Sequence, residues 1–161
     1  METQNLAVFQ ADIAAQCQAI EGVFVSLEQR AVGLTPESPE KLESVAYQLH
    51  NFYSAIEDLF RIIANFFENN VSETARWHSL LLQRMTQPVQ GIRPAVITAE
   101  SYALLNALRG FRHFFRHAYG VSIEFAQLQS NLQKARQLKP MVDKDIQAFL
   151  QALSSDSAGN T

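Results

Sequence analysis

Residues 38–70 read SPEKLESVAYQLHNFYSAIEDLFRIIANFFENN, and this stretch decides the fold class. Its apolar side chains recur at steps of three and four residues, the spacing of one face of an α-helix. They are Leu42, Val45, Leu49, Phe52, Ile56, Leu59, Ile63 and Phe66. Ser38 can cap the first turn, and Pro39 suits the first helical position. The stretch therefore predicts a long helix with a continuous apolar face, which ends at Asn69 and Asn70.

Apolar residues at the same spacing predict four more helices, over residues 6–33, 72–85, 98–120 and 122–153. In the helix over 72–85 we expect these side chains to point inward: Trp77, Leu80, Leu81 and Met85. Pro140 is expected to kink or restart the last helix, because proline removes a backbone hydrogen bond. No alternating stretch is long enough to predict a strand. The sequence predicts an all-α, up-and-down bundle of four to five helices.

The length and composition indicate one globular domain that buries apolar surface. The 161 residues suit one domain, placed at residues 1–153, and the polar residues 154–161 are expected to form a disordered tail. Apolar residues make up 47% of the chain and include 11 Phe, whereas charged residues make up only 18%. This balance favours a homodimer that hides apolar surface between subunits, and the alternative is a Phe-rich core in a monomer.

The net charge, the cysteine content and the absence of a targeting signal or an apolar span in the sequence limit the classes of protein to which this chain can belong. A net charge of −3 and a pI of 5.8 disfavour a protein that coats nucleic acid nonspecifically, but they allow a local basic site. The single cysteine, Cys17, lies on an apolar helical face, which predicts a core residue and no disulfide or cysteine-based metal site. Neither a signal peptide nor a membrane span is expected, so we expect a cytoplasmic protein.

The most informative local feature is a basic segment in this acidic chain. Residues 101–123 hold no acidic side chain, and their basic side chains and histidines are Arg109, Arg112, His113, Arg116 and His117. The three arginines are neighbours on a helix, where they repel one another unless an anion such as phosphate lies nearby. The alternative is a solvated basic face near a helix C-terminus, where the helix dipole favours cations.

The histidines suggest a more specific chemistry. His113 and His117 have the spacing of a metal-binding pair, but the segment offers no cysteine or carboxylate as a further ligand, so no metal or cofactor is expected. Arg112 and His117 lie about 140° apart around a regular helix. To address one phosphate, they need a break in the helix or a second subunit, and we expect both. A histidine that exchanges protons and an arginine that stabilises phosphorane charge are the parts of metal-independent RNA cleavage.

These residues carry a resemblance to a known family. The run from Arg112 to His117 resembles the Arg-polar-x3-His motif of HEPN-domain ribonucleases, with His113 as the polar residue. With Tyr119 it is similar to the Arg-x4-His-x-Tyr motif of HepT-type toxins. Residues 108–120 (LRGFRHFFRHAYG), 75–82 (ARWHSLLL) and 92–94 (IRP) also look like that subfamily, and the resemblance covers most of residues 1–153.

The resemblance implies a homodimeric ribonuclease toxin of a type VII-like toxin–antitoxin system. His117 would be the general acid and base, and Arg112 would bind and polarise the scissile phosphate. His113, Arg116 and Arg109 would be supporting, RNA-binding residues. The implied partner is a minimal nucleotidyltransferase (MNT) antitoxin that transfers AMP from ATP to Tyr119, and the implied substrate is cellular RNA, with tRNA favoured over mRNA.

Two rival functions and two weaker sites remain open. The same bundle can be a noncatalytic substrate-binding partner of a nucleotidyltransferase, or a purely structural helical oligomer. Glu57 and Arg61 are four apart and can pair on the helix surface, or Glu57 can orient Arg112. His78 beside Trp77 can stack on a base, although a core tryptophan with a boundary histidine is favoured.

Overall fold

A computed structural model describes residues 2–68, 76–117 and 122–158, and within these ranges it contains five helices. They are α1 (Glu2–Ala31), α2 (Pro39–Glu68), α3 (Trp77–Met85), α4 (Ala99–His117) and α5 (Phe125–Ala158). The described residues contain no strand, and their one β-type contact is an isolated bridge between Val89 and Arg93. The prediction of an all-α fold is confirmed.

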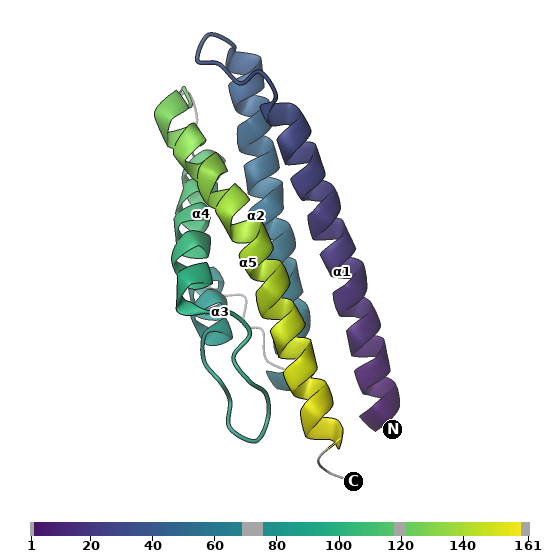
Figure 1. Cartoon of the computed structure of the whole chain (residues 1–161). Coiled ribbons are helices and arrows are strands. Elements are labelled where there is room, and N and C mark those ends of the chain that lie inside the picture. The colour runs from purple at the N-terminus through teal and green to yellow at the C-terminus, as the bar shows by residue number, and fades with distance from the viewer. Residues whose placement is uncertain (1, 69–75, 118–121, 159–161) are drawn as a thin grey trace.

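The four long helices form an up-and-down bundle, with the short α3 beside it (Figure 1). The helices α1 and α2 run side by side, α4 and α5 complete the bundle, and the first turn of α1 and the last turn of α5 lie at the same end of it (Figure 1). The helix α2 packs against each of the other four. None of the described helices is long and apolar enough to cross a membrane.

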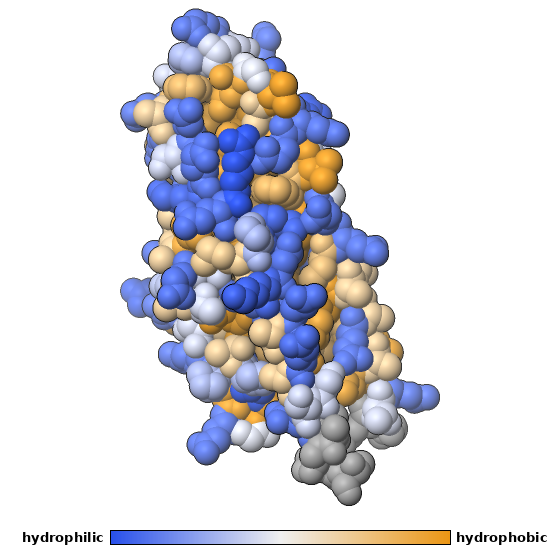
Figure 2. All heavy atoms as spheres, in the orientation of Figure 1, coloured by the Kyte–Doolittle hydropathy of each residue, from blue (hydrophilic) through white to orange (hydrophobic). Residues whose placement is uncertain are grey.

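The core follows the apolar face of α2 that its spacing predicted. Fully or almost fully buried side chains along it are Leu42, Val45, Leu49, Phe52, Ile56, Leu59 and Ile63. Cys17 is half-buried against this core, as its helical position predicted. Hydrophilic side chains spread over most of the face shown in Figure 2, with apolar side chains scattered among them.

One side chain of α3 points the opposite way from the prediction. Leu80 is 54% exposed, whereas Leu81, Leu82 and Met85 are buried. The helix begins only at Trp77, and its period places Leu82 rather than Leu80 on the face that packs against the bundle.

The last helix differs from the expectations in two respects. Pro140 does not divide it, since α5 is one helix of 34 residues with the proline inside it, and buried Leu138 and Val142 flank that position. The expected tail from Ser154 continues this helix to Ala158, while residues 159–161 lie outside the described ones. The hydroxyls of Ser154 and Ser155 donate to the carbonyls of Leu150 and Gln151, so these serines are compatible with the last turns.

The start of α4 is fixed to α5, and this sets which face α4 turns toward α2. The hydroxyl of Thr98 accepts a hydrogen bond from the backbone N–H of Ser101 at 3.2 Å, which is a helix N-cap. The carboxylate of Asp145 on α5 accepts hydrogen bonds from the Ser101 hydroxyl at 2.6 Å and from the Thr98 N–H at 3.3 Å. These bonds hold the first turn of α4 against α5.

The loop before α4 is fixed to the end of α2 by one arginine. The side chain of Arg93 is fully buried and pairs with Glu68 at 2.7 Å. It also donates to the backbone carbonyls of Arg84, Gln87 and Pro94. Together with the cap of α4, this clamp holds α3 and α4 against the same side of α2.

Candidate functional site

Arg112 continues the buried face of α4 instead of lying on an exposed basic stripe. It follows Leu105 and Leu108 at helical spacing, and all three are buried. Only 9% of the Arg112 side chain is exposed. A guanidinium so deeply buried needs partners for its charge and its N–H groups, since an unpaired buried charge is very costly.

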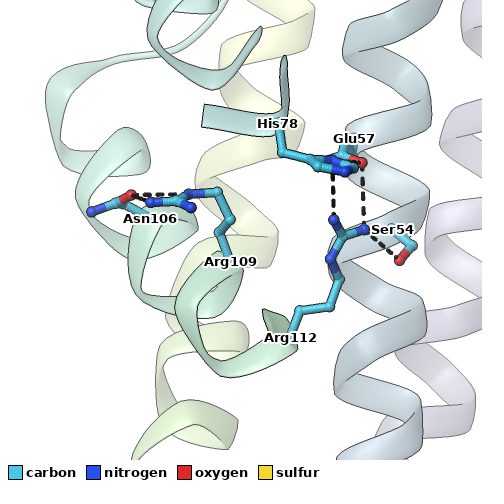
Figure 3. A network of polar contacts seen from close by, with 6 residues as sticks. All are labelled: Ser54, Glu57, His78, Asn106, Arg109 and Arg112. Carbon is cyan, nitrogen blue, oxygen red and sulfur yellow. Dashed lines mark hydrogen bonds and ion pairs between the residues drawn. The ribbon is translucent and has the colours of Figure 1, made fainter. Parts of the chain in front are cut away.

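The helix α2 supplies those partners from one face (Figure 3). Nη1 of Arg112 lies 3.2 Å from the hydroxyl oxygen of Ser54 and 3.4 Å from Oε1 of Glu57. The guanidinium carbon also lies 5.0 Å from the ring centroid of Tyr53, a cation–π contact. The positive charge of Arg112 is therefore balanced by a carboxylate that is itself 95% buried, with 5% of its side chain exposed.

A third helix adds an imidazole to the same cluster. Nδ1 of His78, in the first turn of α3, lies 2.9 Å from each carboxylate oxygen of Glu57. The same nitrogen lies 3.1 Å from Nη2 of Arg112, and 30% of the His78 side chain is exposed. We call Ser54, Glu57, His78 and Arg112 the polar cluster. It joins the three helices α2, α3 and α4 (Figure 3).

Burial, together with the charges of Glu57 and Arg112, shifts the pKa values of two further residues on the same face of α2, Tyr53 and His50. Burial raises the pKa of the Tyr53 hydroxyl well above its usual range, Glu57 raises it further, and Arg112 opposes both. Burial lowers the pKa of His50, an effect that a hydrogen bond to Asn51 opposes and that the positive charges of Arg112 and Arg116 reinforce. Nδ1 of His50 is buried without a hydrogen-bond partner among the described residues. Both groups therefore favour their neutral forms at neutral pH.

The other basic residues of the motif lie apart from the polar cluster. Arg109 turns away and donates two hydrogen bonds to the side-chain oxygen of Asn106, at 2.9 and 3.2 Å (Figure 3). His113 and Arg116 are exposed. Of the predicted site residues, the described structure thus brings Arg112 alone into the cluster and leaves the three supporting residues nearer the surface.

The two remaining predicted residues fall at the limit of the described chain. His117 is the last residue of α4, but its side chain is outside what the structure describes, and Tyr119 lies outside the described residues altogether. The helix is unbroken from Arg112 to His117, so the expected break does not fall between them. On this continuous helix the two residues remain about 140° apart.

The interpretation of Glu57 and Arg61 as a surface pair is wrong. Glu57 is buried and bonds to His78 and Arg112, whereas the guanidinium of Arg61 lies 4.3 Å above the ring of Trp77. Trp77 is half-buried against the core and His78 lies at the boundary, as the sequence favoured. The role of Glu57 in orienting Arg112, which the sequence left open, is the one that the contacts support.

Sequence reasoning missed Ser54, Tyr53 and His50, although a signal was present. These residues precede Glu57 by three, four and seven positions, so all of them lie on one side of α2. Polar residues that recur at helical spacing beside an apolar stripe are a sign of a buried polar face. That sign does not reveal which other helix supplies their partners.

Comparison with known proteins identifies the family of this chain. A family model for HepT-like proteins matches residues 44–153, which is more than half of the chain and runs from α2 through most of α5. No curated protein and no solved structure matches the chain. The matched range contains the whole polar cluster and the segment from Arg112 to Tyr119. The chain therefore belongs to the HepT-like family of HEPN-domain proteins.

Proposed function

We propose that this protein is a metal-independent endoribonuclease toxin of a toxin–antitoxin pair, acting on cellular RNA, with tRNA favoured over mRNA. The observation that carries the proposal is Arg112, the motif arginine, held by Glu57 and Ser54 beside an imidazole. A held guanidinium is suited to stabilise the charge that develops on phosphate during RNA cleavage, because its orientation is set before substrate binds. His117 is the proposed general acid and base.

The chemistry that we propose is transesterification by the RNA's own 2′-hydroxyl. This oxygen loses its proton to a base, attacks the adjacent phosphorus and displaces the 5′ oxygen, which takes a proton from an acid. The products are a 2′,3′-cyclic phosphate and a 5′-hydroxyl. Exposed Arg116 and His113, with Arg109 on the same helix, are suited to bind flanking phosphates, which supports a local RNA-binding surface in an acidic protein.

The proposal includes a homodimer because of the angle between Arg112 and His117 around α4. Since α4 is continuous from Arg112 to His117, the two positions lie about 140° apart around the helix of one copy. Two copies of α4 across a symmetry axis can place Arg112 of one beside His117 of the other. Exposed apolar side chains near this segment, among them Phe114 and Tyr47, are suited to such an interface.

We also propose that an MNT-type nucleotidyltransferase antitoxin neutralises the protein by transferring AMP from ATP to Tyr119. The added phosphates carry negative charge, which repels RNA and competes for the positive side chains of the segment. Tyr119 is the second residue after His117 in the sequence, so a modified tyrosine stays close to the proposed catalytic histidine. The partner and the modification are tested together by the mass of the co-expressed protein.

One observation favours a second function. With only 9% of its side chain exposed, Arg112 can act as a structural cation that links α4 to α2. In that case the chain is a noncatalytic binding partner of a nucleotidyltransferase. The two functions differ in one result, because the binding partner leaves RNA intact.

The deciding experiment measures RNA cleavage by the purified protein in the presence of EDTA. We expect wild type to cleave a tRNA pool and His117→Ala to lose cleavage by about 10²–10⁴-fold, with unchanged far-UV circular dichroism and melting temperature. Protein co-expressed with the nucleotidyltransferase should gain whole AMP units on Tyr119, and Tyr119→Phe should gain none. If His117→Ala cleaves as fast as wild type, the catalytic assignment is wrong. If pure wild type leaves every RNA intact, the binding function is favoured.

A further inference from the structure

The contact between Glu57 and His78 determines which nitrogen of the imidazole carries a proton. Nδ1 of His78 lies 2.9 Å from both oxygens of the Glu57 carboxylate. A carboxylate accepts hydrogen bonds and cannot donate one, so Nδ1 must carry a hydrogen and donate it. The opposite tautomer would point the Nδ1 lone pair at two negative oxygens. In the neutral imidazole, Nε2 is therefore the unprotonated nitrogen.

The short distance between His78 and Arg112 does not alter this assignment. Nη2 of Arg112 lies 3.1 Å from Nδ1, and because a guanidinium can only donate, this contact alone would make Nδ1 an acceptor. The two oxygens of Glu57 lie closer to Nδ1, at 2.9 Å each, and they carry the negative charge, so we assign the proton to Nδ1. The carboxylate thus orients the imidazole and balances the guanidinium at the same time.

The ring of His78 is also fixed from its other side. The indole of Trp77 lies against it, with ring centroids 4.0 Å apart, and Arg61 covers the indole at 4.3 Å. Glu57 and, through Trp77, Arg61 flank His78 from α2, while Arg112 flanks it from α4. Within the described residues Nε2 makes no hydrogen bond, and 30% of the side chain is exposed. An oriented imidazole with an available nitrogen is the arrangement that general bases have in enzymes.

We infer that His78, oriented by Glu57, is a further catalytic residue of this protein, the general base that activates the ribose 2′-hydroxyl, which leaves His117 the role of general acid. The inference rests on the proposed ribonuclease function and deepens it. It also answers a geometric difficulty, because His78 contacts Arg112 within one subunit, whereas His117 lies about 140° from Arg112 around α4. A phosphate that meets the exposed edge of Arg112 then lies beside an imidazole of the same chain.

In the proposed step one proton leaves the attacking 2′-hydroxyl and another is given to the departing 5′ oxygen. Nε2 of His78 takes the 2′-hydroxyl proton as the 2′ oxygen forms its bond to phosphorus. The bond from phosphorus to the 5′ oxygen breaks, and this oxygen takes a proton from the imidazolium of His117. The products are the 2′,3′-cyclic phosphate and the 5′-hydroxyl, and exchange of protons with water restores both histidines. No oxidant, reductant or metal is needed for this balance.

The test uses a substitution that removes the base and keeps the contact with Glu57. In His78→Asn the side-chain amide can still donate to Glu57 from near the Nδ1 position, but it has no basic nitrogen in place of Nε2. We expect the rate of RNA cleavage to fall by about 10²–10⁴-fold, with little change in melting temperature. The pH–rate profile of wild type should be bell-shaped, and His78→Asn should lose its acidic limb, which a merely structural role would not remove.

A second substrate distinguishes the loss of the general base, His78, from the loss of the general acid, His117. A ribonucleoside 3′-(4-nitrophenyl) phosphate has a leaving group that departs without a proton, so its cleavage needs a base but no acid. We expect His117→Ala to cleave this ester nearly as fast as wild type, and His78→Asn to remain impaired. The matched control is Glu28→Gln, which breaks a partly exposed ion pair with Arg136 between α1 and α5. It should leave the rates of RNA cleavage and of aryl ester cleavage unchanged.

Each result bears on one proposal. If wild type cleaves RNA and His78→Asn retains the full rate, or loses rate with its acidic limb intact, the role of His78 as base is wrong while the ribonuclease function stands. If His78→Asn cleaves the aryl ester at the wild-type rate, the base is another group. If wild type cleaves neither substrate, the ribonuclease function fails, and the inference fails with it.

Discussion

The substitution Glu57→Gln tests how much the carboxylate of the polar cluster contributes to stability. Glu57 is 4% exposed and is the carboxylate partner of both Arg112 and His78. Glutamine has nearly the same shape, so the change removes the negative charge and leaves the packing almost intact. Arg112 then remains buried, with 9% of its side chain exposed, and its charge has no carboxylate partner in the polar cluster.

The expected cost follows from this burial. Removal of one partner from a buried ion pair costs about 3–5 kcal/mol, because the other charge is left uncompensated. The lower end applies here, since the Arg112–Glu57 distance is 3.4 Å and Ser54 and the Tyr53 ring still contact the guanidinium. A loss of about 3 kcal/mol corresponds to about 6–12 °C in melting temperature for a domain of this size.

The assay is urea unfolding followed by far-UV circular dichroism, with a matched control. Glu28→Gln breaks the Glu28–Arg136 pair, whose side chains are 39% and 35% exposed, and should cost only about 0–1 kcal/mol. Adding Arg112→Met to Glu57→Gln removes the stranded charge and should restore most of the lost stability. The reasoning is refuted if Glu57→Gln costs no more than Glu28→Gln, or if the double variant is no more stable than Glu57→Gln.

Two further predictions concern pH and the start of α4. Because burial lowers the pKa of folded His50 below the unfolded value of about 6.5, its neutral form stabilises the fold above that pH, and this stability is lost as pH falls below it. Urea unfolding at pH 7.5, 6.5 and 5.5 should therefore show a smaller acid loss in His50→Phe than in wild type, and equal losses would contradict the assignment. Thr98→Ala removes the N-cap of α4 and should cost about 0.5–2 kcal/mol in the same assay, whereas a neutral result would mean that Asp145 alone holds this turn.

The helices were largely predictable because their signal is local. The apolar spacing of residues 42–66 indicated α2, and the structure buries most of that face. The positions that differ from expectation depend on packing: Leu80 is exposed because α3 begins at Trp77, and α5 does not restart at Pro140, which lies inside it between buried neighbours. Local preference does not decide such positions, since tertiary contacts can outweigh a lost hydrogen bond.

The candidate site was predictable only in part. The segment from Arg112 to Tyr119 was visible as a basic run and as a family motif, and the match over residues 44–153 supports the family. The burial of Arg112 and its contact with His78 were not visible, and the role of Glu57 in orienting Arg112 was only one of two open interpretations. Nothing in a basic run indicates that one of its arginines turns inward while Arg109 turns toward Asn106.

By itself, the sequence determined the helical faces, the acid-free basic segment and the membership of the HepT-like family. Only the tertiary structure decided that Glu57, His78 and Arg112 meet, although Glu57 is 21 positions from His78 and 55 from Arg112. The physical reason is that the helical period specifies which residues share a face of one helix. The rotation of each helix about its axis, set here by the Thr98 cap and the Arg93 clamp, specifies which faces meet.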